Sequence, residues 1–134
     1  MVVMKSLTAL RVTAVLHAAV TCLQPVLAGS YLTGNSAAIQ AHRTIGLGLA
    51  GPALLQLLAA TIYWRAGGRG WPALLTVAVL LAEGVQAGAG FHRQFALHVP
   101  LGVAIVGTTV AFAGWTVRPA AHRRRTPRTA VVPG

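Results

Sequence analysis

Acidic side chains are almost missing from this sequence. Of its 134 residues, one is Asp or Glu, eleven are Lys or Arg, and 9% are charged. A soluble domain normally has about a quarter of its residues charged, so a water-soluble globule is excluded. The single carboxylate, Glu83, also excludes an acidic metal cage, and the sequence has neither a nucleophile with a base partner nor a glycine-rich phosphate loop. We therefore predict no catalytic residue and set hydrolysis and phosphoryl transfer aside.

Cysteine is just as scarce. Cys22 is the only one and lies within an apolar stretch, which excludes an intrachain disulfide and a thiolate metal cluster. The net charge of +10 would ordinarily suggest a nucleic-acid partner. Because the basic residues lie between and beyond apolar stretches, they indicate membrane topology instead, and we expect no nucleic-acid binding.

Apolar residues fill most of the chain. They make up 55% of it, and the mean hydropathy is +0.68. Four stretches, at about 7–29, 44–64, 71–90 and 98–117, have the roughly 20 residues that a spanning helix needs. The sequence therefore predicts an all-α, four-transmembrane-helix bundle within residues 1–117. We expect the basic, proline-bearing tail at 118–134 to be disordered and to lie near anionic lipid on the cytoplasmic side.

The basic residues also predict an orientation. Two flank the start of the first stretch, two lie between the second and third, and five follow the fourth: Lys5, Arg11, Arg65, Arg69, Arg118, Arg123, Arg124, Arg125 and Arg128. The other two connections contain only Arg43 and Arg93. Because cytoplasmic segments are enriched in Lys and Arg, we predict a multi-pass protein of the cell (plasma) membrane with both termini cytoplasmic. Trp64, Trp71 and Trp115 then lie at the cytoplasmic interface, where tryptophan is favoured.

Polar and small residues recur at helical spacing within each stretch. The predicted faces hold Thr13, His17, Thr21 and Gln24 in the first stretch; His42, Gly46, Leu49, Ala53, Gln56 and Tyr63 in the second; Thr76, Glu83, Gln86 and Gly90 in the third; and His98, Gly102, Ile105, Thr109, Phe112 and Thr116 in the fourth. An ionisable group facing lipid costs roughly 2 to 3 kcal/mol or more. We therefore expect these faces to point into the bundle.

A short repeat opens the second and fourth stretches. Both read H-x3-G-x4-G, starting at His42 and His98, and each follows a stretch with a late glutamine. The repeat favours two tandem helical hairpins with the two histidines at one depth. Gly46 and Gly102, one turn below them, leave flat space that suits a porphyrin held between two axial imidazoles. The alternative is structural: the glycines serve close helix contact, and the histidines form interfacial hydrogen bonds.

Three segments carry a family resemblance. Leu23-Gln24-Pro25-Val26-Leu27-Ala28-Gly29, His42-Arg43-Thr44-Ile45-Gly46 and Leu97-His98-Val99-Pro100-Leu101-Gly102 resemble a family of small four-helix integral membrane proteins common in actinobacteria, whose function is unknown. More loosely, paired histidines on apolar helices resemble those of b-type cytochromes and ferric-reductase-like membrane domains. Those usually hold two histidine pairs at two depths. The single pair here implies one haem b near the outer face.

Two further ionisable residues lie deep in the predicted membrane. His17 and Glu83 are level with each other, about 15 to 18 Å from the cytoplasmic side at 1.5 Å per residue. Pairing them satisfies both groups, whereas a lone carboxylate at this depth favours taking up a proton. The pair is either a proton acceptor or an interhelical clasp. His92, in the outer loop, is the alternative third imidazole for a copper or zinc site with His42 and His98.

Three function classes follow from these features. The first is a small haem-binding electron carrier, with a quinone or a membrane redox complex as its partner besides the lipid bilayer. The second is a non-catalytic accessory or assembly subunit of a membrane complex, and the third is a small proton-coupled transporter. Self-association as a homo-oligomer stays open, as does the question of whether the protein is an enzyme.

Overall fold

The computed structural model describes residues 2–122, which are almost entirely helical and contain no strand. The all-α prediction is therefore confirmed. The helices are α1 (Val2–Leu32), α2 (Ser36–Gly48), α3 (Ala50–Arg65), α4 (Trp71–Phe91) and α5 (Phe95–Thr116), followed by the 3-10 helix η1 (Pro119–His122). Four segments are long and apolar enough to cross a membrane: Met4–Leu32, Ser36–Arg65, Trp71–Phe91 and Phe95–Thr116. The chain is a multi-pass membrane protein.

The second span differs most from its predicted bounds. It begins at Ser36 rather than near residue 44, because Asn35 caps α2 by accepting a hydrogen bond from the Ala37 amide. It is also interrupted at Leu49, whose amide bonds to Gly46 O over a tighter three-residue turn. Pro52 has no amide hydrogen to donate to the preceding turn, which favours such a break. The histidine at position 42 thus lies well inside this span rather than ahead of it.

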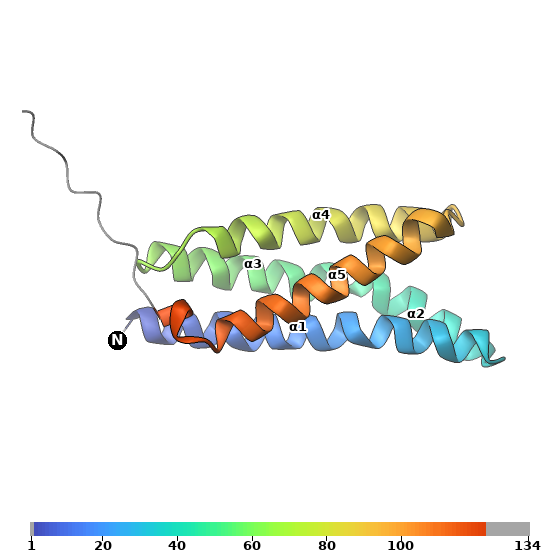
Figure 1. Ribbon diagram of the computed structural model, residues 1–134, viewed down its shortest axis with the longest axis horizontal. Helices are drawn as coiled ribbons and strands as arrows, with labels where there is room; N and C mark the ends of the chain where they lie inside the picture. Colours follow the sequence, from blue (N-terminus) through green and yellow to red (C-terminus); the bar gives the residue numbers. More distant parts are fainter. Residues whose placement is uncertain (1, 123–134) are drawn as a thin grey trace, which may run out of the picture.

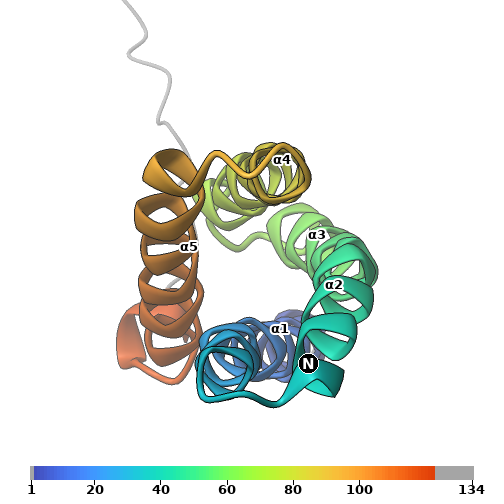
Figure 2. The ribbon, with the colours of Figure 1, turned by 90° about the vertical axis from the view of Figure 1, so that its right-hand side faces the viewer.

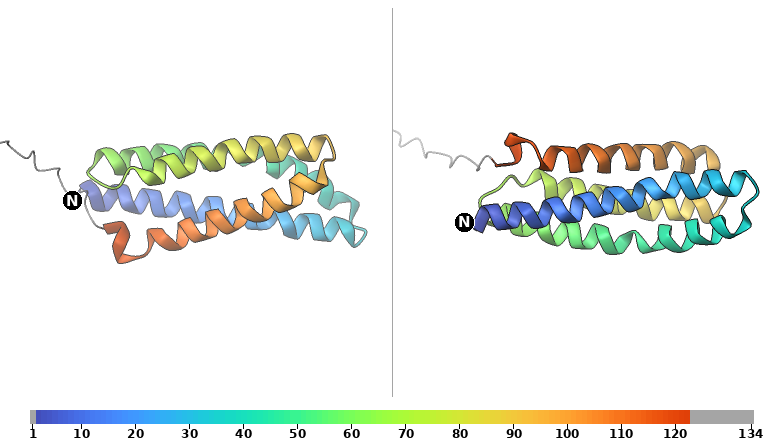
Figure 3. Two further views of the ribbon diagram at one scale, coloured as in Figure 1. Left: turned by 45° about the horizontal axis from the view of Figure 1, so that its top comes forward. Right: turned by 90° about the horizontal axis from the view of Figure 1, so that it is seen from below.

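The spans form a closed ring of four columns. α1 packs beside the α2–α3 column and beside α5, and α4 packs beside α3 and α5 (Figures 1 and 2). Seen end-on, α1 therefore lies diagonally across from α4, and the α2–α3 column lies across from α5 (Figure 2). We call the end with the N-terminus, the α3–α4 turn and η1 the N-terminal end. The opposite end, with the α1–α2 and α4–α5 turns, is the far end (Figure 3).

The predicted inward faces are confirmed. Twelve of their residues are buried: His17, Thr21, Leu49, Ala53, Gln56, Tyr63, Thr76, Glu83, Ile105, Thr109, Phe112 and Thr116. The rest, which lie mainly toward the far end, are half-buried. Large aliphatic side chains cover the outside instead, including Leu74 at 74% and Val103 at 70% exposure. This distribution, apolar outside and polar within, is what a bilayer requires.

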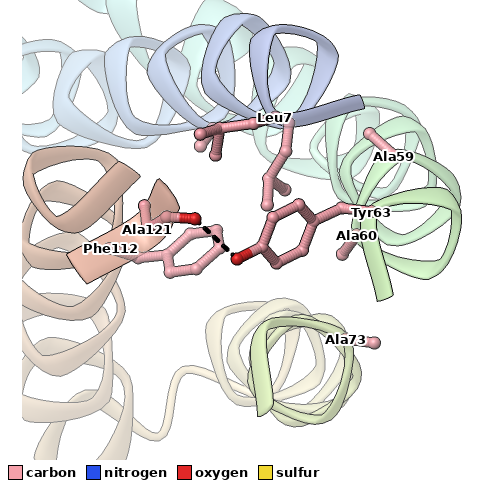
Figure 4. Close-up of a cluster of buried hydrophobic side chains, with 9 residues drawn as sticks. Leu7, Ala59, Ala60, Tyr63, Ala73, Phe112 and Ala121 are labelled. Atoms are coloured by element: carbon pink, nitrogen blue, oxygen red, sulfur yellow. Dashed lines mark hydrogen bonds between the residues drawn. The ribbon is translucent and has the colours of Figure 1, made fainter. Parts of the chain in front are cut away.

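The N-terminal end has a compact core around Tyr63. Leu7, Phe112 and Ala121 lie against its ring, and its hydroxyl donates to Ala121 O at 2.7 Å (Figure 4). Ala121 belongs to η1, so Pro119–His122 fold back onto the bundle. The prediction of a disordered tail beginning at residue 118 is wrong for these residues, because Tyr63 offers them a buried hydrogen bond. Residues 123–134 lie outside the described part of the chain.

Candidate functional site

The most deeply buried polar residues meet at mid-bundle. His17 on α1 is 0% exposed, Gln56 on α3 is 2% exposed and Glu83 on α4 is 8% exposed. His17 Nε2 lies 2.7 Å from Glu83 Oε1, and His17 Nδ1 lies 3.1 Å from Gln56 Oε1. The structure thus brings together the two ionisable residues paired from sequence, across the diagonal between α1 and α4.

The hydrogen bonds continue from Gln56 into α4. Gln56 Nε2 donates to Thr76 Oγ1 at 2.9 Å, and Thr76 Oγ1 donates to Pro72 O at 2.8 Å. Thr76 and Glu83 are seven residues apart, which places them two turns apart on one helix face. One face of α4 therefore supplies both ends of the hydrogen-bond chain, Glu83 and Thr76, and the chain passes through α1 and α3 between them.

One atom of this chain is left over. Glu83 Oε2 is buried and has no hydrogen-bond partner among residues 2–122. An unsatisfied buried polar atom costs about 1–3 kcal/mol. The other carboxyl oxygen is held by His17, so Glu83 presents one satisfied and one free oxygen in the bundle interior.

A hydroxyl pair lies one turn closer to the far end. Thr21 Oγ1 and Thr109 Oγ1 are 2.8 Å apart and join α1 to α5. Each hydroxyl also bonds a backbone carbonyl of its own helix, Ala18 O and Val106 O. With this pair, buried polar contacts connect all four columns near the middle of the bundle.

The two repeat histidines approach each other at the far end. The ring centres of His42 on α2 and His98 on α5 are 6.1 Å apart, with an angle of 70° between the ring planes. Their helices, α2 and α5, lie across the second diagonal of the bundle (Figure 2). Both residues are half-buried. This short distance agrees with the prediction from the repeat that the two histidines lie at the same level of the bundle.

Backbone carbonyls hold both imidazoles in the same way. His42 Nδ1 lies 3.1 Å from Gln24 O, and His98 Nδ1 lies 2.9 Å from Gln86 O. A carbonyl can only accept, so each Nδ1 carries the hydrogen, and in the neutral ring Nε2 then has a free lone pair. Metal-binding histidines typically donate their other ring N–H in this manner. The two hairpins therefore repeat one local structure, with a glutamine carbonyl orienting a histidine on the next helix.

The two glycines below the histidines are covered by glutamine side chains. A Cβ at Gly46 would lie 3.2 Å from Gln24 Oε1, and one at Gly102 would lie 2.7 Å from Gln86 Nε2. The other amide atoms, Gln24 Nε2 and Gln86 Oε1, are buried and have no partner within the described residues. Next to the histidine pair, two glutamine side chains thus fill the space above two glycines, and each leaves one amide atom without a bond in the described part of the chain.

His92 does not join this pair. It is exposed at the end of α4, where its amide caps the helix by bonding Gly88 O. Within residues 2–122, no three His, Cys, Asp or Glu side chains are grouped closely enough to hold a metal ion. The copper or zinc site with three imidazoles stays a prediction.

Sequence reasoning overlooked two roles. Gln56 and Thr76 were placed on inward faces but not connected to His17, because their contact crosses between helices whose relative heights a sequence does not contain. The carbonyls of Gln24 and Gln86 were overlooked too, although the late glutamine shared by both hairpins was visible.

The geometry of the site is the main guide to function here. Compared with known proteins, the chain matches no family model, no curated protein and no solved structure. The resemblance to small actinobacterial four-helix membrane proteins stays a prediction.

Proposed function

We propose that this protein is a small membrane electron carrier that binds one b-type haem between His42 and His98. One observation carries the proposal: two imidazoles from opposite columns of the bundle approach edge to face, with 6.1 Å between ring centres, and each has its Nδ1 bonded to a backbone carbonyl. That bond fixes the tautomer and makes Nε2 the more basic ligand. It leaves two ligand lone pairs at one level of the bundle.

The spacing of the rings supports a shared metal. If both rings held one metal ion, at about 2 Å from the metal to each ring nitrogen and about 1 Å from that nitrogen to the ring centre, their centres would be about 6 Å apart. The observed separation is 6.1 Å.

The surroundings also suit a macrocycle. The atoms that occupy the space beside Gly46 and Gly102 are the ends of the Gln24 and Gln86 side chains, which are flexible and can turn aside. In their present positions each leaves a buried amide atom unbonded, so displacing them gives up little. A haem bound there supplies a one-electron ferric–ferrous couple.

The location follows from the charge pattern. With the basic connections in the cytoplasm, the far end faces outward in the plasma membrane and the haem lies near the outer leaflet. A quinone or a neighbouring membrane redox complex is then the expected electron partner. Labelling of Ser36→Cys or Gln94→Cys from outside intact cells, with Gly67→Cys protected, tests this orientation in a Cys22→Ser background. Protection of both outer positions would reverse it.

The haem proposal is tested by the visible spectrum of protein expressed with ample haem and purified in detergent. The reduced-minus-oxidised spectrum should show a b-type signal, and His42→Ala or His98→Ala should abolish the Soret band. His92→Ala is the matched control, because it removes an exposed histidine at the same end, and it should keep full haem content. A colourless wild-type protein would contradict the proposal and favour the accessory-subunit function.

Steric substitution gives a second test. Gly102→Leu should lower haem retention, because its side chain fills the space beside the histidine pair. Gly107→Leu, at an exposed glycine on the same helix with open space around it, should retain haem. Equal loss in both variants would indicate a general folding defect instead of exclusion.

A further inference from the structure

The hydrogen-bond chain at mid-bundle has a direction that can be read from its fixed end. Pro72 O can only accept, so the Thr76 hydroxyl donates to it across 2.8 Å. The Thr76 oxygen then accepts from the Gln56 amide nitrogen. This orients Gln56 Oε1 toward His17 Nδ1, 3.1 Å away, and His17 Nδ1 must carry a hydrogen.

The direction of the chain determines the state of the contact between His17 and Glu83. With Nδ1 already protonated, the 2.7 Å line from Nε2 to Glu83 Oε1 needs one further proton. That proton belongs either to Glu83, which donates to a neutral ring, or to His17, which donates to a carboxylate. In both forms the pair has no net charge. A neutral unit is what a low-dielectric interior favours.

The pair also has one open place for a proton. Glu83 Oε2 is buried and unpartnered within the described residues, whereas both His17 nitrogens and Glu83 Oε1 are engaged. A second proton on Oε2 would give a neutral carboxylic acid beside an imidazolium, a net charge of +1. Such a charge is unfavourable at this depth unless a negative charge arrives nearby.

An electron that enters at the histidine pair would bring such a charge toward Glu83, because α4 connects the two places. Gln86, whose carbonyl holds His98, follows Glu83 by three residues, a rise of about 4.5 Å along α4. The other titratable or cationic side chains in the surrounding spans are Arg11, Cys22, His42, Tyr63 and His98, with Lys5, Tyr31, Arg43 and Arg65 toward the span ends. Arg11 is bonded to Thr116 O and Tyr63 to Ala121 O at the N-terminal end. Glu83 is therefore the only carboxylate in these spans.

We propose that His17 and Glu83 form a proton-acceptor site that takes up one proton when one electron enters at the His42–His98 site. The electron comes from an external one-electron donor, and the proton comes from hydronium in the water phase, whose O–H bond breaks and leaves a water molecule. A new O–H bond forms at Glu83 Oε2, no bond breaks within the pair, and the two added charges cancel. The redox half of this inference rests on the proposed haem; the proton-acceptor half does not.

The test is the midpoint potential of the haem-loaded protein as a function of pH. When one proton is taken up with each electron, a tenfold change in proton concentration changes the midpoint potential by about 59 mV. The wild-type potential should therefore fall by up to about 59 mV for each unit of rising pH. Glu83→Gln should keep haem and fold, because an amide can still bond His17, but its potential should change little with pH. Thr21→Val is the matched control: it removes a buried hydroxyl one turn away and should keep the wild-type slope.

Infrared difference spectra separate the possible failures. The carboxyl bands of Glu83 should change on reduction of wild type, by the appearance or the shift of a carboxylic-acid band, and this change should be missing in Glu83→Gln. A pH-independent wild-type potential, or an equal slope in Glu83→Gln, would overturn the coupling while the haem proposal stands. If wild type binds no haem, the proposed function and the redox half fail together. The same bands, followed while the colourless protein is acidified, still decide whether the pair accepts a proton, and carboxyl bands that do not change overturn that half too.

Discussion

Tyr63 at the N-terminal end and the histidine pair at the far end are both polar groups inside the bundle, but their surroundings differ. Tyr63 is completely buried and its hydroxyl is bonded. Beside it, Phe112 stacks on Trp115 with 5.8 Å between ring centres. At the far end, His42 and His98 are half-buried, and the amide atoms Gln24 Nε2 and Gln86 Oε1 have no partner among the described residues.

The two ends therefore differ in how completely their buried polar groups are bonded. At the N-terminal end, the buried atom without a hydrogen-bond partner among the described residues is Arg11 Nε, and the same guanidinium is anchored through Nη2 to Thr116 O. Each unsatisfied buried group costs about 1–3 kcal/mol. The far end carries that cost beside two oriented imidazoles, which is the pattern expected where a ligand, not the protein, completes the packing.

The two hairpins differ in a second way. Both have the glutamine carbonyl that holds a histidine, followed by a glycine one turn below that histidine. Three residues before the glutamine, one hairpin has Thr21 and the other has Glu83. The repeated part forms the proposed haem site, and the unrepeated carboxylate forms the proposed proton site.

The largest expected effect comes from breaking the N-terminal end. Phe112→Ala should lower the free energy of unfolding in detergent by about 3 kcal/mol, because it leaves a cavity between Trp71, Trp115 and Tyr63. Thermal unfolding followed by circular dichroism measures this. A loss smaller than that of Val103→Ala, an exposed position on the same helix, would contradict the assignment of the stabilising core to this end.

A smaller effect should follow from removing one hydroxyl. Tyr63→Phe deletes the bond to Ala121 O, worth about 1 kcal/mol. We expect η1 to detach from the bundle, and limited proteolysis after residue 118 should become faster. Tyr31→Phe, at an exposed tyrosine of α1, is the control and should change neither quantity. Unchanged protection in Tyr63→Phe would show that η1 is held by other contacts.

The smallest effect on stability is expected at the far end. Gln24→Leu removes an amide whose nitrogen is unbonded, while the carbonyl that holds His42 stays in place. The free energy of unfolding of the haem-free protein should change by less than about 1 kcal/mol, or increase, because replacing an unsatisfied polar group relieves its desolvation cost. A large destabilisation would mean that this amide is bonded in the membrane and that the far end is packed as fully as the N-terminal end.

The sequence alone determined that there are four spans and which of their faces point inward. Those features depend on hydropathy and on the 3.6-residue period, which act within one helix. The ends of the helices were predicted less accurately. α1 extends to Leu32 and α2 begins at Ser36, because turn geometry and the Asn35 cap set these bounds rather than apolarity.

Only the tertiary structure decided which polar groups meet. The contacts of His17 with Gln56 and Glu83, and of each far-end histidine with a glutamine carbonyl, join different helices. Their formation depends on the relative height and rotation of the columns, which are set by packing between side chains far apart in sequence. The same holds for η1, whose buried Ala121 carbonyl is bonded by Tyr63, 58 positions earlier in the chain. Local patterns determine what a helix presents, and packing between helices decides what that surface meets.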